Sequence, residues 1–428
     1  MKDVFKTIIV DFMERELKEV KERDYHLPLN SKKIVSVIGI RRCGKTYLLF
    51  DLIKKLRKKM PKENIIYINF EDDRLFGITV SHLTYLIDGY FELYPEKRKE
   101  KIYLFLDEIE IVPGWEKFVR RVYDNFNVNI FITGSSSRLL RKEISSSLRG
   151  RTITYDIFPL SFREYLTFSN VKPENVSSKS KSLIKNLFYK YLKFGGFPEL
   201  VDEEEDIKRK ILSDYVDLIV YRDIIERYGI KNITLLKTII KYSFSNPSTL
   251  ISFNKLYNEL KSLGYKLGKE TLYDFFDYLE DAFALFTVPI FKNSVKKERR
   301  NPKKLYIADN GFKYIFNTSL SPENSKLLEN MVFLHLRRKY RGIYYYRGKQ
   351  EVDFFVNEGG EKKLINVCYS LNSLDTKKRE IKGLLEGMEY FGLKKSYLIT
   401  AEEEEKIEIE GKTIITIPFC KWSLQRLD

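Results

Sequence analysis

A glycine-rich run that ends in a lysine and a threonine lies near the start of this 428-residue sequence, GIRRCGKT at residues 39–46. It fits the spacing GxxxxGK[ST] and lies between an apolar stretch and an amphipathic one, as a phosphate-binding loop lies between a strand and a helix. Glycines let a backbone wrap closely around phosphate, so that successive N–H groups face the anion. In this pattern Lys45 reaches the β- and γ-phosphates of ATP, and the Thr46 hydroxyl binds Mg²⁺. The residues predicted to bind the nucleotide are Gly39, Arg41, Arg42, Cys43, Gly44, Lys45 and Thr46.

Two adjacent carboxylates, Asp107 and Glu108, follow the apolar run at residues 102–106. A carboxylate that emerges from a buried strand beside a phosphate loop can hold the magnesium ion, and we assign that role to Asp107 together with Thr46. Glu108 comes one residue later and is placed to orient or deprotonate the attacking water. The sequence therefore predicts ATP hydrolysis with Mg²⁺ as cofactor.

Two weaker signals follow the next apolar runs. Ser135 comes directly after residues 129–133, where its hydroxyl could sense the γ-phosphate, although small polar residues after a strand commonly form only a turn. Arg149 and Arg151 precede the run at residues 152–157, and one of them could act on a neighbouring subunit's phosphate as an arginine finger or be plain surface charge. With both alternatives open, the predicted catalytic set is Lys45, Asp107, Glu108, Ser135 and Arg151.

These side chains can meet only if several strands end at one edge of a sheet. Apolar runs of strand length recur at residues 34–38, 65–70, 102–106, 128–133 and 152–157, and helical patterns lie between them. Such alternation predicts an α/β fold with crossover helices.

The composition sets limits on the class of protein. The chain has 76 Lys and Arg residues against 60 Asp and Glu, a net charge of +16, and 43% of its residues are hydrophobic. These values exclude a disordered or collagen-like chain, and no apolar run approaches the roughly 20 residues of a membrane-spanning helix. Three widely separated cysteines argue for a reducing compartment, so we predict a cytoplasmic protein without membrane contact.

A series of motifs, in a fixed order along nearly the whole chain, resembles the archaeal and bacterial AAA-type P-loop ATPases. The runs that carry the resemblance are GIRRCGKT, YINFEDDRL, YLFLDEIEIVPGWEKFVRRVYD, ITGSSS, LRGRTITYDIFPLSFREYL, FGGFPE and YRDIIERYGI. The resemblance implies an AAA+-like P-loop ATPase core at residues 1–160, a helical lid at 161–234, a winged helix at 235–318 and a restriction-nuclease-like α/β domain at 319–428. It also implies that Glu71, Asp72 and Arg74 flank the nucleotide, and that Arg222 and Asp223 belong to the lid.

The segment expected to form the winged helix has an uneven charge distribution. The helix expected at residues 270–281 is acidic, so we do not expect it to enter a DNA groove. The stretch from residue 291 to 304 has only Glu298 against seven basic residues, Lys292, Lys296, Lys297, Arg299, Arg300, Lys303 and Lys304. This stretch could contact a nucleic-acid backbone without reading its sequence, or form a solvated loop.

The C-terminal domain resembles the nuclease pattern at Glu329 and at Glu351-Val352-Asp353. Where the pattern would have Glu-x-Lys in the next strand, the chain has Asn366-Val367-Cys368, so a carboxylate and the lysine of the metal site are missing. Residues 361–363 match the letters but follow two glycines, and we expect them in a turn. We therefore predict a nuclease-like domain without nuclease activity.

Together these features predict an ATPase that couples hydrolysis to movement of its appended domains, with nucleic acid as the expected ligand and a homo-oligomer as one possible assembly. The alternative is a slow nucleotide-gated switch or scaffold that controls protein partners.

Overall fold

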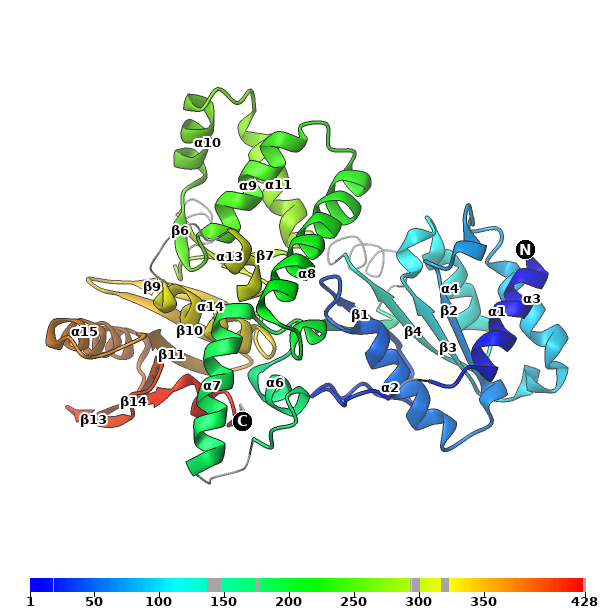
Figure 1. The fold of residues 1–428 in the computed structure, drawn as a ribbon, viewed down its shortest axis with the longest axis horizontal. Coiled ribbons are helices and arrows are strands. Elements are labelled where there is room, and N and C mark those ends of the chain that lie inside the picture. The colour runs from blue at the N-terminus through cyan, green and yellow to red at the C-terminus, as the bar shows by residue number, and fades with distance from the viewer. Residues whose placement is uncertain are drawn as a thin grey trace. The chain divides into compact units, whose positions relative to one another are not determined.

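The computed structural model describes residues 1–17, 19–136, 148, 150–173, 178–292, 294, 301–316 and 323–425. The chain divides into two compact units, Met1–Ile157 and Phe158–Asp428. Each unit has its own sheets and covering helices (Figure 1).

The first unit is built on a five-stranded parallel sheet. Its strands are β1 (Ile34–Gly39), β2 (Ile65–Asn69), β3 (Ile102–Asp107), β4 (Val128–Gly134) and β5 (Thr152–Ile157). They lie in the order β2-β3-β4-β1-β5, and all pairings are parallel. All five predicted strands are confirmed within one or two residues, and the α/β core with them.

Parallel strands need crossover helices, and these cover both faces of the sheet. The helices of this unit are α1 (Lys2–Glu14), α2 (Lys45–Arg57), α3 (Thr84–Leu93) and α4 (Trp115–Asn125). The chain moves from β1 to β2 and then back through β3 to β4, so right-handed crossovers place α2 and α4 on opposite faces of the sheet (Figure 1). Burial on both faces explains why the strands are continuous apolar runs. Phe105 and Phe131, for example, are register partners whose rings stack 4.6 Å apart.

The second unit begins with helices and a small antiparallel sheet. Its first elements are α6 (Phe162–Phe168), α7 (Ser178–Phe194), α8 (Glu205–Leu218), a π-helical turn (Ile219–Glu226), α9 (Ile233–Ser245), β6 (Thr249–Ile251), α10 (Phe253–Ser262), α11 (Lys269–Asp281), β7 (Leu285–Val288), β8 (Lys303–Ile307) and α13 (Asn310–Phe316). The three strands pair in the order β6-β8-β7. Arg222 and Asp223 lie in the π-helical turn. The arrangement has the helices and the hairpin expected of a winged helix, and that identification stays a prediction.

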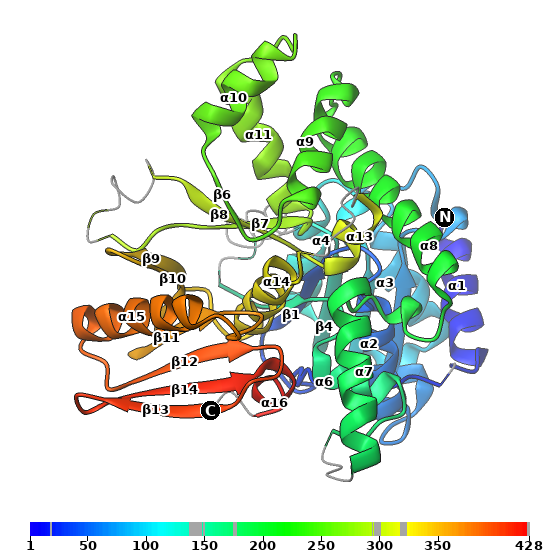
Figure 2. The same ribbon diagram turned by 60° about the vertical axis from the view of Figure 1, so that its left-hand side comes forward.

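The rest of the second unit is a six-stranded mixed sheet. Its elements are α14 (Asn324–Arg337), β9 (Ile343–Arg347), β10 (Glu351–Glu358), β11 (Glu361–Val367), α15 (Leu374–Phe391), β12 (Lys395–Thr400), β13 (Glu405–Ile409), β14 (Lys412–Pro418) and α16 (Phe419–Trp422). The order is β13-β14-β12-β11-β10-β9. Figure 2 shows α15 along one face of this sheet. Neighbouring residues Phe354 and Phe355 of β10 belong to separate buried clusters, so each face of the sheet packs against its own core.

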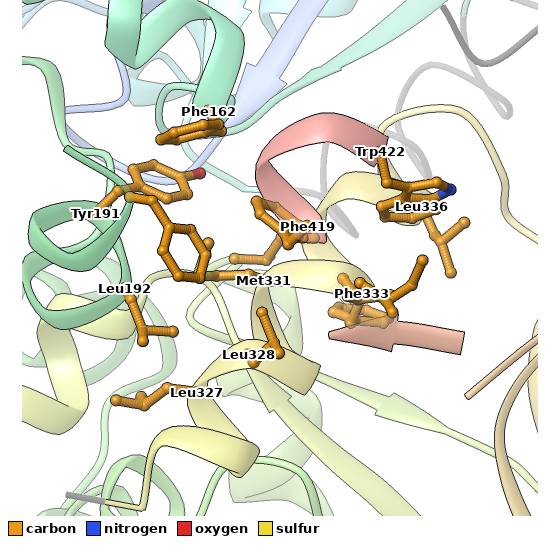
Figure 3. Close-up of a cluster of buried hydrophobic side chains, with 14 of the residues drawn as sticks. Phe162, Tyr191, Leu192, Leu327, Leu328, Met331, Phe333, Leu336, Phe419 and Trp422 are labelled. Carbon is orange, nitrogen blue, oxygen red and sulfur yellow. The ribbon is translucent and has the colours of Figure 1, made fainter. Parts of the chain in front are cut away.

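One buried cluster joins the helices that follow Phe158 to the C-terminal sheet (Figure 3). Phe162 of α6 and Tyr191 of α7 lie on one side of it, and Met331 of α14 and Phe419 of α16 on the other. The rings of Phe162 and Phe419 are 6.1 Å apart. The segment predicted to be a lid therefore shares a core with the C-terminal domain.

The Gly195-Gly196 turn has a packing role. Gly195 has φ +77°, and a Cβ there would lie 1.5 Å from a carboxylate oxygen of Asp309. That carboxylate accepts hydrogen bonds from the backbone N–H groups of Gly196 (2.7 Å) and Gly311 (2.8 Å). Burial raises the pKa of Asp309 to about 7. The two glycines thus let Asp309 bridge the end of α7 and the start of α13.

Two predictions about this unit are wrong. Residues 361–363 form the start of β11, because Gly359 and Gly360, both with positive φ, make the whole two-residue turn of the β10–β11 hairpin. Lys304 does not belong to an exposed basic patch, since it is 3% exposed and ion-paired with three carboxylates. Lys292 is exposed and Lys303 is half-buried.

The other basic residues of that predicted patch, Lys296, Lys297, Arg299 and Arg300, lie outside the described residues, as does Arg149. Across the described ranges, no helix combines the length and the apolar character needed to cross a membrane.

His335 provides a test of the second unit's core. It lies on α14 with its ring 4.6 Å from that of Trp422, and its Nε2 has no hydrogen-bond partner within the described part of the chain. Burial, with repulsion from Arg338 and Lys363, lowers the pKa of His335 to about 3. Below pH 6.5 the unfolded chain binds a proton at this position and the folded chain does not, so stability is lost as the pH falls.

We expect the wild type to lose about 2 kcal/mol more unfolding free energy between pH 7 and pH 5 than His335→Phe does, as measured by urea denaturation. All other titrating groups are common to the two proteins and cancel in the comparison. Equal pH dependence in both would contradict a buried, uncharged His335.

Candidate active site

The loop at residues 39–46 joins β1 to α2, as predicted. Gly39 ends β1 so close to β5 that a Cβ there would lie 2.1 Å from the carbonyl oxygen of Ile157. Gly44, with φ +98°, forms the N-cap of α2, and Arg42 also has a positive φ of 65°. Such backbone angles are favourable for glycine and costly for other residues. The loop therefore turns sharply, and the N-terminus of α2 opens at the carboxyl edge of the sheet.

Lys45 is the first residue of α2, and its side chain turns back over the loop. Its Nζ donates to the carbonyl oxygens of Gly39 (3.0 Å) and Ile40 (3.4 Å) and lies 3.5 Å from Oε1 of Glu108. Lys45 is only 5% exposed. The loop thus holds a buried ammonium group at its centre.

Asp107 is held at the site by hydroxyl groups, because both of its oxygens accept hydrogen bonds from them. Oδ2 accepts from Thr46 Oγ1 (2.8 Å) and from Tyr67 Oη (2.7 Å), and Oδ1 accepts from Thr133 Oγ1. Thr46 is the second residue of α2, Tyr67 lies on β2 and Thr133 on β4. The predicted pair Thr46 and Asp107 is therefore brought together, with two partners that sequence reasoning missed. Their position near the carboxyl ends of the strands beside β3 is the signal that could have found them.

Glu108 adopts an unusual backbone conformation, with φ +53°. Its backbone N–H donates to Thr133 Oγ1 (2.9 Å), so one hydroxyl holds both the carboxylate of Asp107 and the backbone of Glu108. Burial raises the pKa of Glu108 to about 7, with repulsion from Glu110 and Asp107 in the same direction and attraction to Lys45 opposing it. Strained backbone and a raised carboxyl pKa are typical of catalytic positions.

Ser135 lies at the same edge of the sheet, directly after β4, but its partner is an acid that the sequence did not single out. Oε1 of Glu110 accepts hydrogen bonds from the backbone N–H (3.0 Å) and the hydroxyl (2.9 Å) of Ser135, and Oε2 accepts from the N–H of Ser136 (3.4 Å). Glu110 therefore fixes the backbone of the loop after β4. A role for Ser135 in sensing phosphate stays a prediction.

The arginines predicted near the nucleotide fall into separate groups. Arg41 of the loop lies 2.8 Å from Oε1 of Glu71, which follows β2. Arg74 binds Asp72 (2.8 Å) and Asp11 of α1 (2.6 Å). Glu71 thus meets the loop through Arg41, whereas Arg74 is anchored to the N-terminal helix.

Arg151 lies at the opposite edge of the sheet from the loop. It precedes β5, which runs parallel to β1 from the pair Ile34 and Thr152 to the pair Gly39 and Ile157. Six residues of strand span roughly 20 Å. Its Nε lies 3.2 Å from Oδ1 of Asp124. Arg151 therefore cannot reach a phosphate bound in its own loop, and both predicted alternatives, action on a neighbouring subunit and plain surface charge, stay open.

The donor set fits a magnesium–nucleotide complex. Mg²⁺ prefers hard oxygen ligands, and the Thr46 hydroxyl and Asp107 carboxylate present theirs 2.8 Å apart. A triphosphate requires a cation and backbone N–H groups, which Lys45 and the start of α2 provide. Elsewhere, the described residues contain no group of three or more acidic, histidine or cysteine side chains suited to a metal ion.

Family comparisons agree with this geometry. A family model described as an AAA domain matches residues 31–166, the stretch that contains the loop, Asp107 and Ser135. Two domains of unknown function match the second unit, DUF8612 at residues 185–321 and DUF4143 at residues 324–420. No function is assigned to either, so the winged-helix and nuclease-like interpretations stay predictions.

Relatives match along nearly the whole chain. An uncharacterized protein of Haemophilus influenzae is 32% identical over 92% of this chain and 94% of its own length. Among solved structures, the Walker-type ATPase paby2304 of Pyrococcus abyssi is 15% identical, with a TM-score of 0.44 over 74% of this chain and 95% of that one. The uncharacterized protein MJ1544 of Methanocaldococcus jannaschii is 40% identical over 99% of this chain and 96% of its own length. Residues 31–166 thus match an AAA domain, and the chain belongs to the family of MJ1544.

Proposed function

We propose that the protein is a magnesium-dependent ATPase that uses hydrolysis to change the conformation of its second unit. The observation that carries this proposal is that two contacting pairs, Thr46 with Asp107 and Lys45 with Glu108, lie at one edge of a parallel sheet and are linked through Thr133. A triphosphate needs a cation, a metal ligand set and a water-orienting acid, and the chain has one of each.

Each side chain has a distinct part in the proposed reaction. Mg²⁺ supplies neutralisation of the charge that develops on the β- and γ-phosphates. Thr46 and Asp107 would hold the ion, and Tyr67 and Thr133 keep the Asp107 carboxylate oriented. Lys45 would leave its carbonyl partners for the phosphates. Glu108 would hold the attacking water and accept its proton.

The ion pair between Lys45 and Glu108 favours the second candidate, a slow nucleotide-gated switch. At 3.5 Å the two groups neutralise each other, and Glu108 can act on water only when Lys45 turns to a phosphate. Steady-state turnover separates the candidates, since a switch binds ATP tightly with little hydrolysis and a motor turns over continuously.

We also propose a polyanionic ligand, nucleic acid, for the basic stretch at residues 292–303. The support is the charge of the sequence: without Lys304 the stretch still has six basic residues against Glu298. Lys292 is exposed, which suits a phosphate contact.

Binding and turnover should respond differently to two variants. Lys45→Ala removes the cation for the phosphates and should weaken ATP binding roughly 10- to 100-fold in calorimetry. Glu108→Gln keeps the shape of the side chain and removes the base, so ATP affinity should persist while phosphate release slows about 10²- to 10⁴-fold. Glu96→Gln, the same change on the surface, is the matched control. Normal turnover in Glu108→Gln would contradict the role of Glu108.

Two hydroxyl deletions test how Asp107 is held. Tyr67→Phe removes one bond to Asp107, so the Mg²⁺ concentration for half-maximal hydrolysis should rise about 2- to 10-fold with kcat nearly unchanged. Thr133→Val also frees the Glu108 backbone, so kcat should fall about 10-fold as well. Ser36→Ala is the control, because this buried β1 hydroxyl has no hydrogen-bond partner among the described residues. The same Mg²⁺ dependence and the same kcat in all three variants would contradict these roles of Tyr67 and Thr133.

Nucleic-acid action is tested by turnover with and without duplex DNA over a range of salt concentrations. We expect stimulation that weakens as salt rises, because phosphate contacts release counterions. Lys292→Glu with Lys303→Glu should reduce the stimulation and the salt slope, whereas Lys179→Glu, at an exposed position of α7 outside the basic stretch, should leave both unchanged. Wild-type ATP turnover that does not change when duplex DNA is added would exclude duplex DNA as this ligand.

A further inference from the structure

Lys304 lies at the centre of a buried cluster in the second unit. Its side chain is 4% exposed, and its Nζ lies 2.6 Å from Oδ1 of Asp353, 3.0 Å from Oε1 of Glu329 and 3.0 Å from Oε1 of Glu351. Lys304 belongs to β8, Glu329 to α14, and the other two acids to β10. One ammonium group therefore joins three elements that are up to 49 residues apart.

Further hydrogen bonds from the chain hold the carboxylates of Glu329 and Asp353. Tyr306 donates its hydroxyl proton to Oε1 of Glu329 (2.7 Å), and the backbone N–H of Val367 donates to Oδ2 of Asp353 (2.8 Å). Asn366 accepts from the backbone N–H of Asp353 (2.9 Å). The carboxylates are thus held in place around Nζ.

Charge keeps the lysine protonated. Burial alone would lower the pKa of the Lys304 ammonium, but attraction to Asp353, Glu329 and Glu351 raises it well above its ordinary value. Burial also raises the pKa of Glu329, to about 7, and Asp353 adds to that shift. The cluster therefore contains a permanent cation facing an excess of acid.

The nuclease resemblance implies a divalent metal held by Glu329 and Asp353, and the residues present do not fit one. A metal ion held between Glu329 and Asp353 would lie against carboxylates whose Oε1 and Oδ1 atoms already contact Nζ, and two cations so close together would repel each other strongly. A lysine that assists a metal lies beside the ion, against one carboxylate, whereas Nζ lies within 3.0 Å of all three.

We infer that Lys304 takes the place of a divalent cation, so that the acidic cluster is a metal-free clamp between β8 and the C-terminal sheet, and that removal of this one amine turns it into a divalent-cation site. The clamp joins residues 303–307, within the DUF8612 match, to α14 and β10, within the DUF4143 match. The inference does not depend on ATP hydrolysis.

Manganese binding to the full-length protein without nucleotide tests the inference, with free Mn²⁺ followed by electron paramagnetic resonance. We expect Lys304→Met, which keeps the length of the side chain without its charge, to bind one more Mn²⁺ per chain than the wild type, at least tenfold tighter than any wild-type site. The extra site should disappear in Lys304→Met/Asp353→Asn. Lys303→Met, the neighbour on the same strand, should behave as the wild type.

Thermal unfolding gives a second readout. Lys304→Met should melt at a lower temperature than the wild type, because three carboxylates then face one another, and Mn²⁺ should restore part of the loss. If Lys304→Met is insoluble, the Mn²⁺ titration can be made on Lys304→Met/Glu351→Gln, in which one of the three repelling carboxylates is removed. A wild-type Mn²⁺ site that is lost in Glu329→Gln would overturn the inference, and so would a folded Lys304→Met that gains no ion.

Discussion

The carboxylate of Asp107 is the constraint on which the proposed active site depends. It is 1% exposed, and a buried carboxylate is tolerated only when its oxygens are bonded. Its three hydroxyl partners come from the start of α2 and from both strands that flank β3. The bonds to Thr46 and Thr133 therefore place the phosphate loop and Glu108 relative to the sheet. The parallel register of β2, β3 and β4 is what brings these side chains to one level.

Charge balance explains why the site would take a metal–nucleotide complex and not a bare triphosphate. Asp107, Glu108 and Glu110 converge near a single lysine, and Glu110 is already engaged with the Ser135 loop. A free polyphosphate would meet a surplus of negative charge here. A complex that brings its own divalent cation would offset that surplus, and the hydroxyl and carboxylate oxygens beside the loop are suited to that ion. The raised pKa of Glu108 has the same origin in burial and like charge.

The sequence predicted the first unit well because its strands are buried on both faces, which makes each one a continuous apolar run. It did not single out Tyr67 or Thr133, which look like ordinary strand residues until the register brings them to Asp107. The prediction that Lys304 is exposed was wrong for the opposite reason. Lys304 ends a run of basic residues, which indicated an exposed side chain. The acids that pair with it lie 25 to 49 residues later in the sequence.

The shared core of the second unit limits how nucleotide chemistry can be transmitted. A lid that moved alone would have to pull Phe162 and Tyr191 away from Phe419 and α14, at roughly 1.5–3 kcal/mol for each large apolar side chain exposed. Asp309 ties the end of α7 to α13, and the Lys304 clamp ties β8 to α14 and β10. Helices α6 and α7 should therefore move together with the C-terminal sheet. Because the core continues from Phe158 into α14 and α16, this coupling needs no separate element within the second unit.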